Sequence, residues 1–246
     1  MIIFSYNINL KGDFFMSNFY QFINKIKTLS STLENYHYIY NSDNLTESEI
    51  NDLKQLNCAI KTSVAENILS ASIKGVSRDD LYYVVDSQSD EELRSVFGKC
   101  RYIISNFNQL ERINSISKEL VKKGFLESIA ISFSLDNSSI FCKESIHKLS
   151  STLKNLDSIA VRGLFFTCNA ETSEDYITYM KSAYDTTKEI TCILPCKITF
   201  LSLGSCIDIL SEASIEQSDS NLQFIKNANL VSFLNTTSFY SRLLIS

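Results

Sequence analysis

Short apolar runs alternate with longer amphipathic segments along most of the chain. The runs are rich in β-branched and aromatic residues, which is typical of strands buried on both faces. In the segments between them, apolar residues recur every three or four positions, which is typical of helices that lie on a sheet. The first run covers residues 14–17, and a helix is expected directly after it. Eight further strand candidates begin at residues 36, 57, 80, 100, 128, 158, 197 and 229.

Strands and helices in strict alternation indicate an α/β protein with a parallel sheet. Eight such units in 246 residues favour a (β/α)8 TIM-type barrel. An open doubly wound sheet is the alternative, but the G-x-G-x-x-G turn that would support it is absent from the sequence. No linker, low-complexity tract or block of like charge interrupts the chain. Residues 1–246 are therefore expected to form a single barrel domain.

Local signals agree with these boundaries at several helix ends. Thr46 and Glu49 have the spacing of a capping box, and so do Ser89 and Glu92. Gly75 follows an amphipathic segment and is expected to end that helix. A weaker helix is expected near residues 206–227, ahead of the last strand candidate.

Composition removes several classes of function. Hydrophobic residues make up 44% of the chain and the net charge is −5, so the charge carries no sign of a nucleic-acid site. No apolar run approaches the length of a membrane-spanning helix, and the N-terminus does not resemble a signal peptide. The seven cysteines are scattered, and no zinc-site spacing joins them to the two histidines. We therefore expect no metal, no membrane partner and a cytoplasmic location with reduced thiols.

The order of the segments resembles the barrel of the pyridoxal-phosphate decarboxylases that act on ornithine, arginine, diaminopimelate and carboxynorspermidine. That barrel is akin to the barrel of alanine racemase. The resemblance runs from about residue 13 to the C-terminus. It rests on six stretches, which are "DFFMSNFYQFINKIKTL", "CAIKTSVAENILSASIKGVSRDDLYYVVDSQSDEELRSV", "YIISNFNQLERI", "VRGLFFTCNAETSEDYITYMKSA", "ITFLSLGSCI" and "TSFYSRLLIS".

The resemblance places the cofactor lysine of these enzymes at the end of the first barrel strand. Here that strand is "YIYNSDN", and Asn41 stands at the lysine position. An amide cannot condense with the cofactor aldehyde as a lysine amine does. The histidine that stacks on the cofactor corresponds to Thr167. The resemblance therefore implies a barrel that has lost two residues of its catalytic site.

Further departures fall in the last two strands of the resemblance. The three glycines that cradle the cofactor phosphate correspond to Gly204, Ser205 and Cys206, so one glycine remains. The acid that pairs with the cofactor ring corresponds to Phe239, and only Arg242 of that motif is kept. The sequence also stops where the family continues into a β-domain. The resemblance thus implies a degenerate member without that domain.

A second alignment remains open, in which "CAIKTS" is the lysine motif and Lys61 holds the cofactor. It leaves only seven strands from the lysine strand onward, one short of a barrel. It also lengthens the spacing from residues 14–17 by one strand–helix unit. An isolated lysine at a strand end is ordinarily solvated.

Three functions are consistent with these residues. The first is a non-catalytic, decarboxylase-like protein that binds a protein partner, namely an active paralogue, a regulator or a second copy of itself, and needs no cofactor. The second is a pyridoxal-phosphate decarboxylase or racemase that uses Lys61. The third is a barrel that binds a small anion. The positions expected to line the barrel mouth are Asn41, Thr167, Gly204, Ser205 and Arg242.

Overall fold

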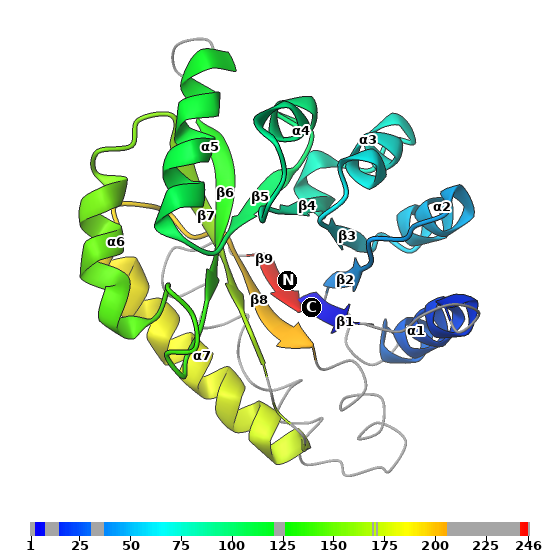
Figure 1. Ribbon diagram of the computed structural model, residues 1–246. Helices are drawn as coiled ribbons and strands as arrows, with labels where there is room; N and C mark the ends of the chain where they lie inside the picture. The colour runs from blue at the N-terminus through cyan, green and yellow to red at the C-terminus, as the bar shows by residue number, and fades with distance from the viewer. Residues whose placement is uncertain are drawn as a thin grey trace.

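Parallel strands curl round a single axis, and the helices lie outside them (Figure 1). The computed structural model describes residues 3–7, 15–30, 37–120, 126–168, 170, 172–205 and 242–245. The strands are β1 (Ile3–Asn7), β2 (His37–Asn41), β3 (Ala59–Thr62), β4 (Leu81–Val84), β5 (Arg101–Ile104), β6 (Glu127–Phe133), β7 (Ile159–Phe166), β8 (Phe200–Ser205) and β9 (Arg242–Ile245). The helices are α1 (Phe15–Ser30), α2 (Glu47–Gln55), α3 (Ala65–Ile73), α4 (Asp90–Ser95), α5 (Phe107–Leu120), α6 (Ile146–Leu153) and α7 (Ser173–Ile193), with 3-10 helices at Arg78–Asp80 and Lys143–Ser145.

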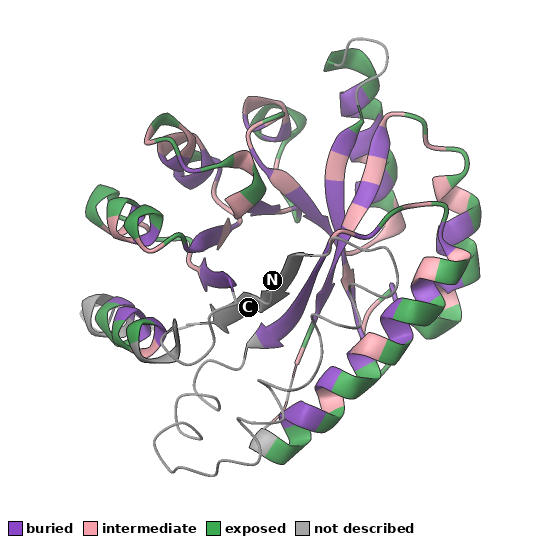
Figure 2. Ribbon diagram, turned by 180° about the vertical axis from the view of Figure 1, so that it is seen from behind, coloured by how far each residue is buried: buried purple, intermediate pink, exposed green. Residues whose placement is uncertain are grey.

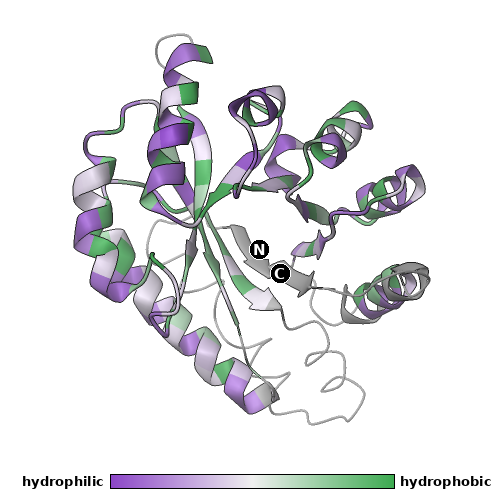
Figure 3. Ribbon diagram, viewed as in Figure 1, coloured by the Kyte–Doolittle hydropathy of each residue, from purple (hydrophilic) through white to green (hydrophobic). Residues whose placement is uncertain are grey.

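Strands β2 to β8 pair in sequence order, and every pair is parallel. Figure 2 shows buried residues along these strands and exposed residues on the outer sides of the helices. Figure 3 shows the strands β5 and β6 as mostly hydrophobic, whereas the helices carry both kinds of residue. This is the arrangement expected when strands are covered on one side by helices and on the other by the barrel interior. The predicted α/β barrel is confirmed.

The ring is closed by two short strands, β1 and β9, which share one position between β2 and β8. Strand β9 pairs with the lower part of β2, at His37 and Tyr38, and with the beginning of β8. Strand β1 pairs with the upper part of β2, from Ile39 to Asn41, and with the later residues of β8. The first and last of the described strands therefore lie end to end between β2 and β8. Figure 1 shows the two chain ends next to each other at this place.

The expected strand at residues 14–17 is wrong. Helix α1 begins at Phe15, and the first strand is β1, upstream of it. Apolar residues from this point recur every three or four positions, and the rings of Phe19 and Phe22 lie 5.3 Å and 4.7 Å from the ring of Tyr40 on β2. That helical spacing determines the structure of the run. The helix expected at residues 206–227 and the strand expected at 229–237 lie outside the described residues.

Both predicted capping boxes are present. The backbone N–H of Thr46 donates to the Glu49 carboxylate at 2.7 Å, and the N–H of Glu49 donates to Thr46 Oγ1 at 3.3 Å. Ser89 and Glu92 form the same reciprocal pair at 2.8 Å and 3.2 Å. Gly75 adopts a φ of 80° directly after α3, as expected of a glycine that ends a helix.

Candidate functional site

The barrel interior is filled by three aromatic side chains from different strands. The ring of Tyr82 on β4 lies 5.2 Å from that of Phe165 on β7 and 5.6 Å from that of Phe200 on β8. The rings of Phe165 and Phe200 are 6.2 Å apart. All three pairs meet edge to face, which is a favourable geometry for aromatic rings. We call these three residues the aromatic plug.

A glycine makes room for the plug. A Cβ atom at Gly163 would lie 2.0 Å from the ring of Phe200, which no side chain tolerates. Gly163 and Phe200 are partners in the β7–β8 pairing, so the ring of Phe200 lies over the glycine backbone. Both plug phenylalanines are buried. This close packing makes the aromatic plug an integral part of the hydrophobic core.

A cation contacts the plug at each end. Lys61 Nζ, on β3, lies 5.6 Å from the centre of the Phe165 ring, and the Arg101 guanidinium, on β5, lies 4.7 Å from that of Phe200. Arg101 also donates to Tyr82 Oη at 3.3 Å and to Asp79 Oδ1 at 2.7 Å. Cations are attracted to ring faces by the charge distribution of the π-system. The plug is therefore held by electrostatic contacts as well as by packing.

Asn41 and Lys61 are neighbours at the carboxyl end of the barrel. They are direct partners in the pairing of β2 with β3, so their side chains leave the sheet on the same face. Lys61 is partnered in turn by Tyr82, which places all three on the interior face. Lys61 is half-buried rather than solvated. Burial lowers the pKa of its amine to about 8, and the negative charge of Asp43 acts in the opposite direction.

Thr167 and Gly204 lie at the ends of the neighbouring strands β7 and β8. Thr167 is exposed, and its backbone N–H donates to Phe133 O at 3.4 Å. Gly204 is buried with a φ of 82°, and a Cβ atom there would lie 2.3 Å from Cys168 Cβ. The backbone of Gly204 is thus covered by Cys168. Burial raises the pKa of the Cys168 thiol to about 11, which makes it a poor nucleophile.

The structure does not bring Arg242 to the other predicted mouth residues. Ser205 ends β8, whereas Arg242 begins β9 as the partner of Phe200 at the other end of β8. Five residues of strand span roughly 16 Å. By backbone position, Asn41, Thr167 and Gly204 are therefore at the mouth with Ser205, and Arg242 is at the opposite end of the barrel.

Polar side chains that the sequence analysis did not single out tie the loops of the mouth together. The Asp43 carboxylate, after β2, accepts hydrogen bonds from Thr62 Oγ1 at 2.9 Å, Ser63 N at 2.6 Å and Ser63 Oγ at 2.7 Å, after β3. Asn67 Nδ2 donates to Asp43 O at 3.0 Å. Gln88 Nε2, after β4, donates to Ser63 O at 3.0 Å. Each loop is thereby joined to the next.

The chain of contacts continues round the rim. Gln109 Nε2, on α5, donates to Val85 O at 2.8 Å, and Arg112 donates to Gln88 O at 2.6 Å and to Asp90 Oδ1 at 2.5 Å. The only sequence signal for these contacts is a set of polar residues after each strand, a composition shared by most turns. We call this set the rim network; its members are Asp43, Thr62, Ser63, Asn67, Gln88, Gln109 and Arg112.

The described mouth residues do not fit a cofactor site of the kind that the resemblance implies. Asn41 offers an amide where the lysine is expected. Cys168 covers the one remaining glycine, Gly204, and the aromatic plug packs the interior from the level of Lys61 towards the amino end. Within the part of the chain that the structure describes, no cluster of three metal-ligating side chains occurs. No helix among the described residues is long and apolar enough to cross a membrane.

No protein-family model and no curated protein matches the sequence. Solved structures do match. A point mutant of diaminopimelate decarboxylase from Helicobacter pylori, complexed with L-lysine, superposes with a TM-score of 0.64 at 12% identity, over 83% of this chain and 59% of that enzyme. The arginine decarboxylase of Paramecium bursaria Chlorella virus, bound to agmatine, gives a TM-score of 0.61 at 15% identity, over 81% and 59%.

Ornithine decarboxylase from Entamoeba histolytica gives a TM-score of 0.62 at 12% identity, over 89% of this chain and 60% of that enzyme. The chain thus spans about three fifths of the length of these enzymes. Identities this low carry the fold and leave the function to be argued from the site. The chain has the barrel fold of the decarboxylases that its segments resemble.

Proposed function

We propose that this barrel, which has the fold of the pyridoxal-phosphate decarboxylases, carries out no decarboxylation and acts by binding a protein. The partner is an active decarboxylase of the same fold, another regulated protein, or a second copy of this chain. The observation that carries the proposal is Asn41, an amide at the strand end where the resemblance places the cofactor lysine. A decarboxylase needs an amine for the cofactor aldehyde and backbone N–H groups that are open to the cofactor phosphate. Here an amide stands in place of the amine, and Cys168 covers the backbone of Gly204.

The rim network supports a binding role. Its bonds use donors and acceptors of the mouth for contacts between loops, from Asp43 to Gln109. Loops fixed in this way lose little conformational entropy when a partner covers them, which favours protein association. An enzyme of this fold would instead point such groups at a substrate.

The cofactor question is tested by adding pyridoxal phosphate to the purified protein. We expect no visible absorbance band that borohydride removes, and no cofactor mass on any lysine peptide after reduction. Asn41→Lys is expected to restore neither, because Cys168 still covers Gly204. A reducible band in the unaltered protein would overturn the non-catalytic proposal.

The partner role is tested separately by equilibrium sedimentation of the protein alone and mixed with an active ornithine or arginine decarboxylase from its own organism. We expect a defined complex at micromolar concentration and a changed rate of carbon dioxide release by the active enzyme. Two species that sediment independently, together with a monomeric chain, would contradict a binding role.

A second candidate function is a cofactor-dependent enzyme that uses Lys61. The favouring observation is its place beside Asn41, on the interior face of the next strand, with a pKa of about 8. An amine that is less often protonated at neutral pH reacts more readily with an aldehyde. In this case Lys61→Ala would abolish the reducible band. Lys148→Ala is the matched control, because Lys148 also lies over a ring, 4.5 Å from that of Phe107.

A further inference from the structure

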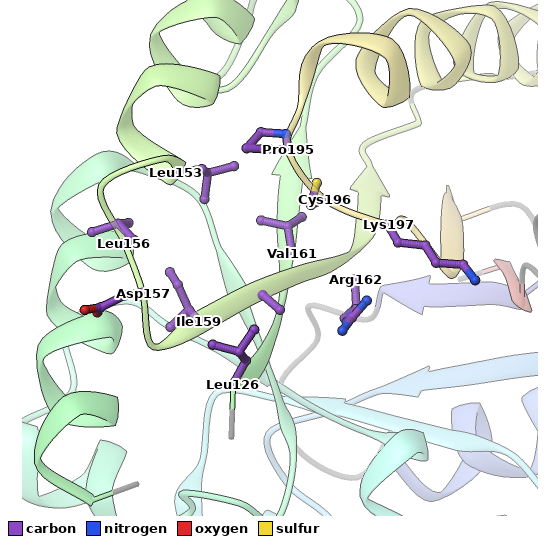
Figure 4. A pocket seen from close by; sticks show the side chains of 11 residues that line it. Leu126, Leu153, Leu156, Asp157, Ile159, Val161, Arg162, Pro195, Cys196 and Lys197 are labelled. Carbon is purple, nitrogen blue, oxygen red and sulfur yellow. The ribbon is translucent and has the colours of Figure 1, made fainter. Parts of the chain in front are cut away.

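A cavity of about 310 Å³ lies away from the mouth, between α6, β7 and the segment that leads from α7 to β8. Its volume is in the range of small-molecule sites. Figure 4 shows the apolar side chains of Leu153, Leu156 and Ile159 on one side, with the side chains of Arg162 and Lys197 on the other. The cavity therefore has an apolar part and a cationic part.

Arg162 owes its position to an irregularity in β7. The pairing of β6 with β7 passes from Ile129 with Val161 to Ala130 with Gly163, so Arg162 is an extra residue. Such bulges redirect a side chain and recur beside functional sites. Thr199 holds the bulge, because its N–H and Oγ1 both donate to Arg162 O, at 2.6 Å and 3.1 Å.

The wall opposite β7 is the segment after α7. Pro195 is the only proline of the chain, and it follows Leu194, which caps that helix. A proline here fixes the backbone as it leaves the helix, so the positions of Cys196 and Lys197 are well defined. Burial raises the pKa of the Cys196 thiol to about 12, and the positive charge of Arg162 acts against this rise. Cys196 and Arg162 line the same cavity.

The two cations of the cavity have no carboxylate partner among the described residues. Other basic residues form ion pairs, such as Arg78 with Glu127 and Arg94 with Glu119, whereas Arg162 and Lys197 form none with the described carboxylates. The one acidic residue that lines the cavity, Asp157, pairs with Lys118 at 3.1 Å. The cavity therefore has a net positive character at one end.

We propose that this cavity binds a medium-chain aliphatic carboxylate. The apolar tail would lie among Leu153, Leu156 and Ile159, and the carboxylate would contact Arg162 and Lys197. Burial of methylene groups stabilises the tail, and charge-assisted hydrogen bonds from a guanidinium orient the head. This site is independent of the mouth and of the proposed partner.

Isothermal titration with octanoate tests the proposal. We expect saturable binding, and binding at least about tenfold weaker for acetate and for inorganic phosphate, which lack the tail. Octylamine, which reverses the charge of the head, is expected not to bind. Octanol that binds as tightly as octanoate, or the absence of any octanoate binding, would overturn the proposal.

Substitutions of the two cations test where the carboxylate of octanoate binds. Arg162→Gln is expected to weaken octanoate binding about tenfold, and so is Lys197→Gln. Arg94→Gln, which removes the same charge from an ion pair elsewhere, is the matched control and is expected to leave the affinity unchanged. Since the side chain of Lys197 is exposed, its variant keeps the test valid if Arg162→Gln fails to fold. An equal loss in Arg94→Gln and Arg162→Gln would overturn the assignment.

Cysteine alkylation tests where the aliphatic chain of octanoate lies. Iodoacetamide labelling, followed by peptide mass spectrometry, compares Cys196, which lines the cavity, with Cys192, which is exposed on α7. Octanoate is expected to slow the labelling of Cys196 several-fold and to leave Cys192 unchanged. Equal rates at Cys196 with and without octanoate would place the ligand elsewhere and contradict the proposal.

Discussion

The two ends of the barrel are held by different chemistry. At the carboxyl ends of the strands, the rim network joins loops mainly through side-chain bonds to backbone and hydroxyl groups, as between Gln88 and Ser63. At the amino ends, ion pairs join neighbouring strands and turns, such as that of Arg78 with the buried Glu127 and that of Arg101 with the exposed Asp79. In enzymes with this architecture, the carboxyl end carries the chemistry and the amino end carries stability.

In the proposed function, this chain departs from that division. The described polar groups of the rim network bind one another, and the aromatic plug packs the interior below them. Arg162 and Lys197, two cations that have no carboxylate partner among the described residues, line a cavity at the other end of β7. Polar residues at the catalytic end of a barrel are therefore evidence of function only when they are available to a ligand.

Removing an ion pair at the amino end is expected to lower the free energy of unfolding the most. Glu127 is fully buried; burial raises the pKa of its carboxyl, and Arg78 lowers it through charge and a hydrogen bond. Arg78→Met leaves that carboxylate without a counter-charge and should lower the free energy of unfolding by about 3 kcal/mol. Urea unfolding monitored by circular dichroism measures this. The double variant with Glu127→Gln should recover part of the loss, and no recovery would contradict the pairing.

Breaking the carboxyl end is expected to cost less. Asp43→Ala removes the acceptor for Thr62 and Ser63, and the lost bonds are charge-assisted but partly exposed to water. We expect a loss of about 2 kcal/mol in the same measurement. Hydrogen exchange should show faster opening of the loops after β2 and β3 with no change at the amino end. Uniform acceleration over the whole barrel would show that the rim is not a separate unit.

The smallest expected effect is a pH dependence at Lys61. Its pKa is about 8 in the folded chain against an ordinary 10.5, so between these values the unfolded chain binds more protons than the folded chain. Stability should therefore rise as the pH rises through this window. After a discount for partial exposure, the rise is about 1 kcal/mol. Lys61→Met should abolish this rise in stability. An identical dependence of stability on pH in both proteins would show that the pKa of Lys61 is not lowered by folding.

The sequence predicted the strands β2 to β8 because each is a short apolar run between amphipathic segments. It failed at residues 14–17, where two adjacent phenylalanines gave the appearance of a strand and the helical spacing further along decided the outcome. The plug was not predictable, because it depends on which residues of β4, β7 and β8 lie level with one another. That register is set by the closed ring and leaves no trace in local sequence.

The same limit explains the relation between Asn41 and Lys61. Each was recognised as a strand-end residue, but the sequence presented them as rivals for one position. The pairing of β2 with β3 makes them neighbours. Asp43, two residues after Asn41, was overlooked because its partners lie in the next loop, beyond the reach of any local pattern.

The position that β1 and β9 share between β2 and β8 has a consequence for the synthesis of the protein. Strands β1 to β8 leave the ribosome before β9, so the beginnings of β2 and β8 are still unpaired. Such edges invite pairing with other chains until residues 242–245 emerge and pair with both strands. The newborn chain therefore passes through a period of exposed strand edges that lasts until β9 is made, and a chaperone or a prompt partner would be most useful then.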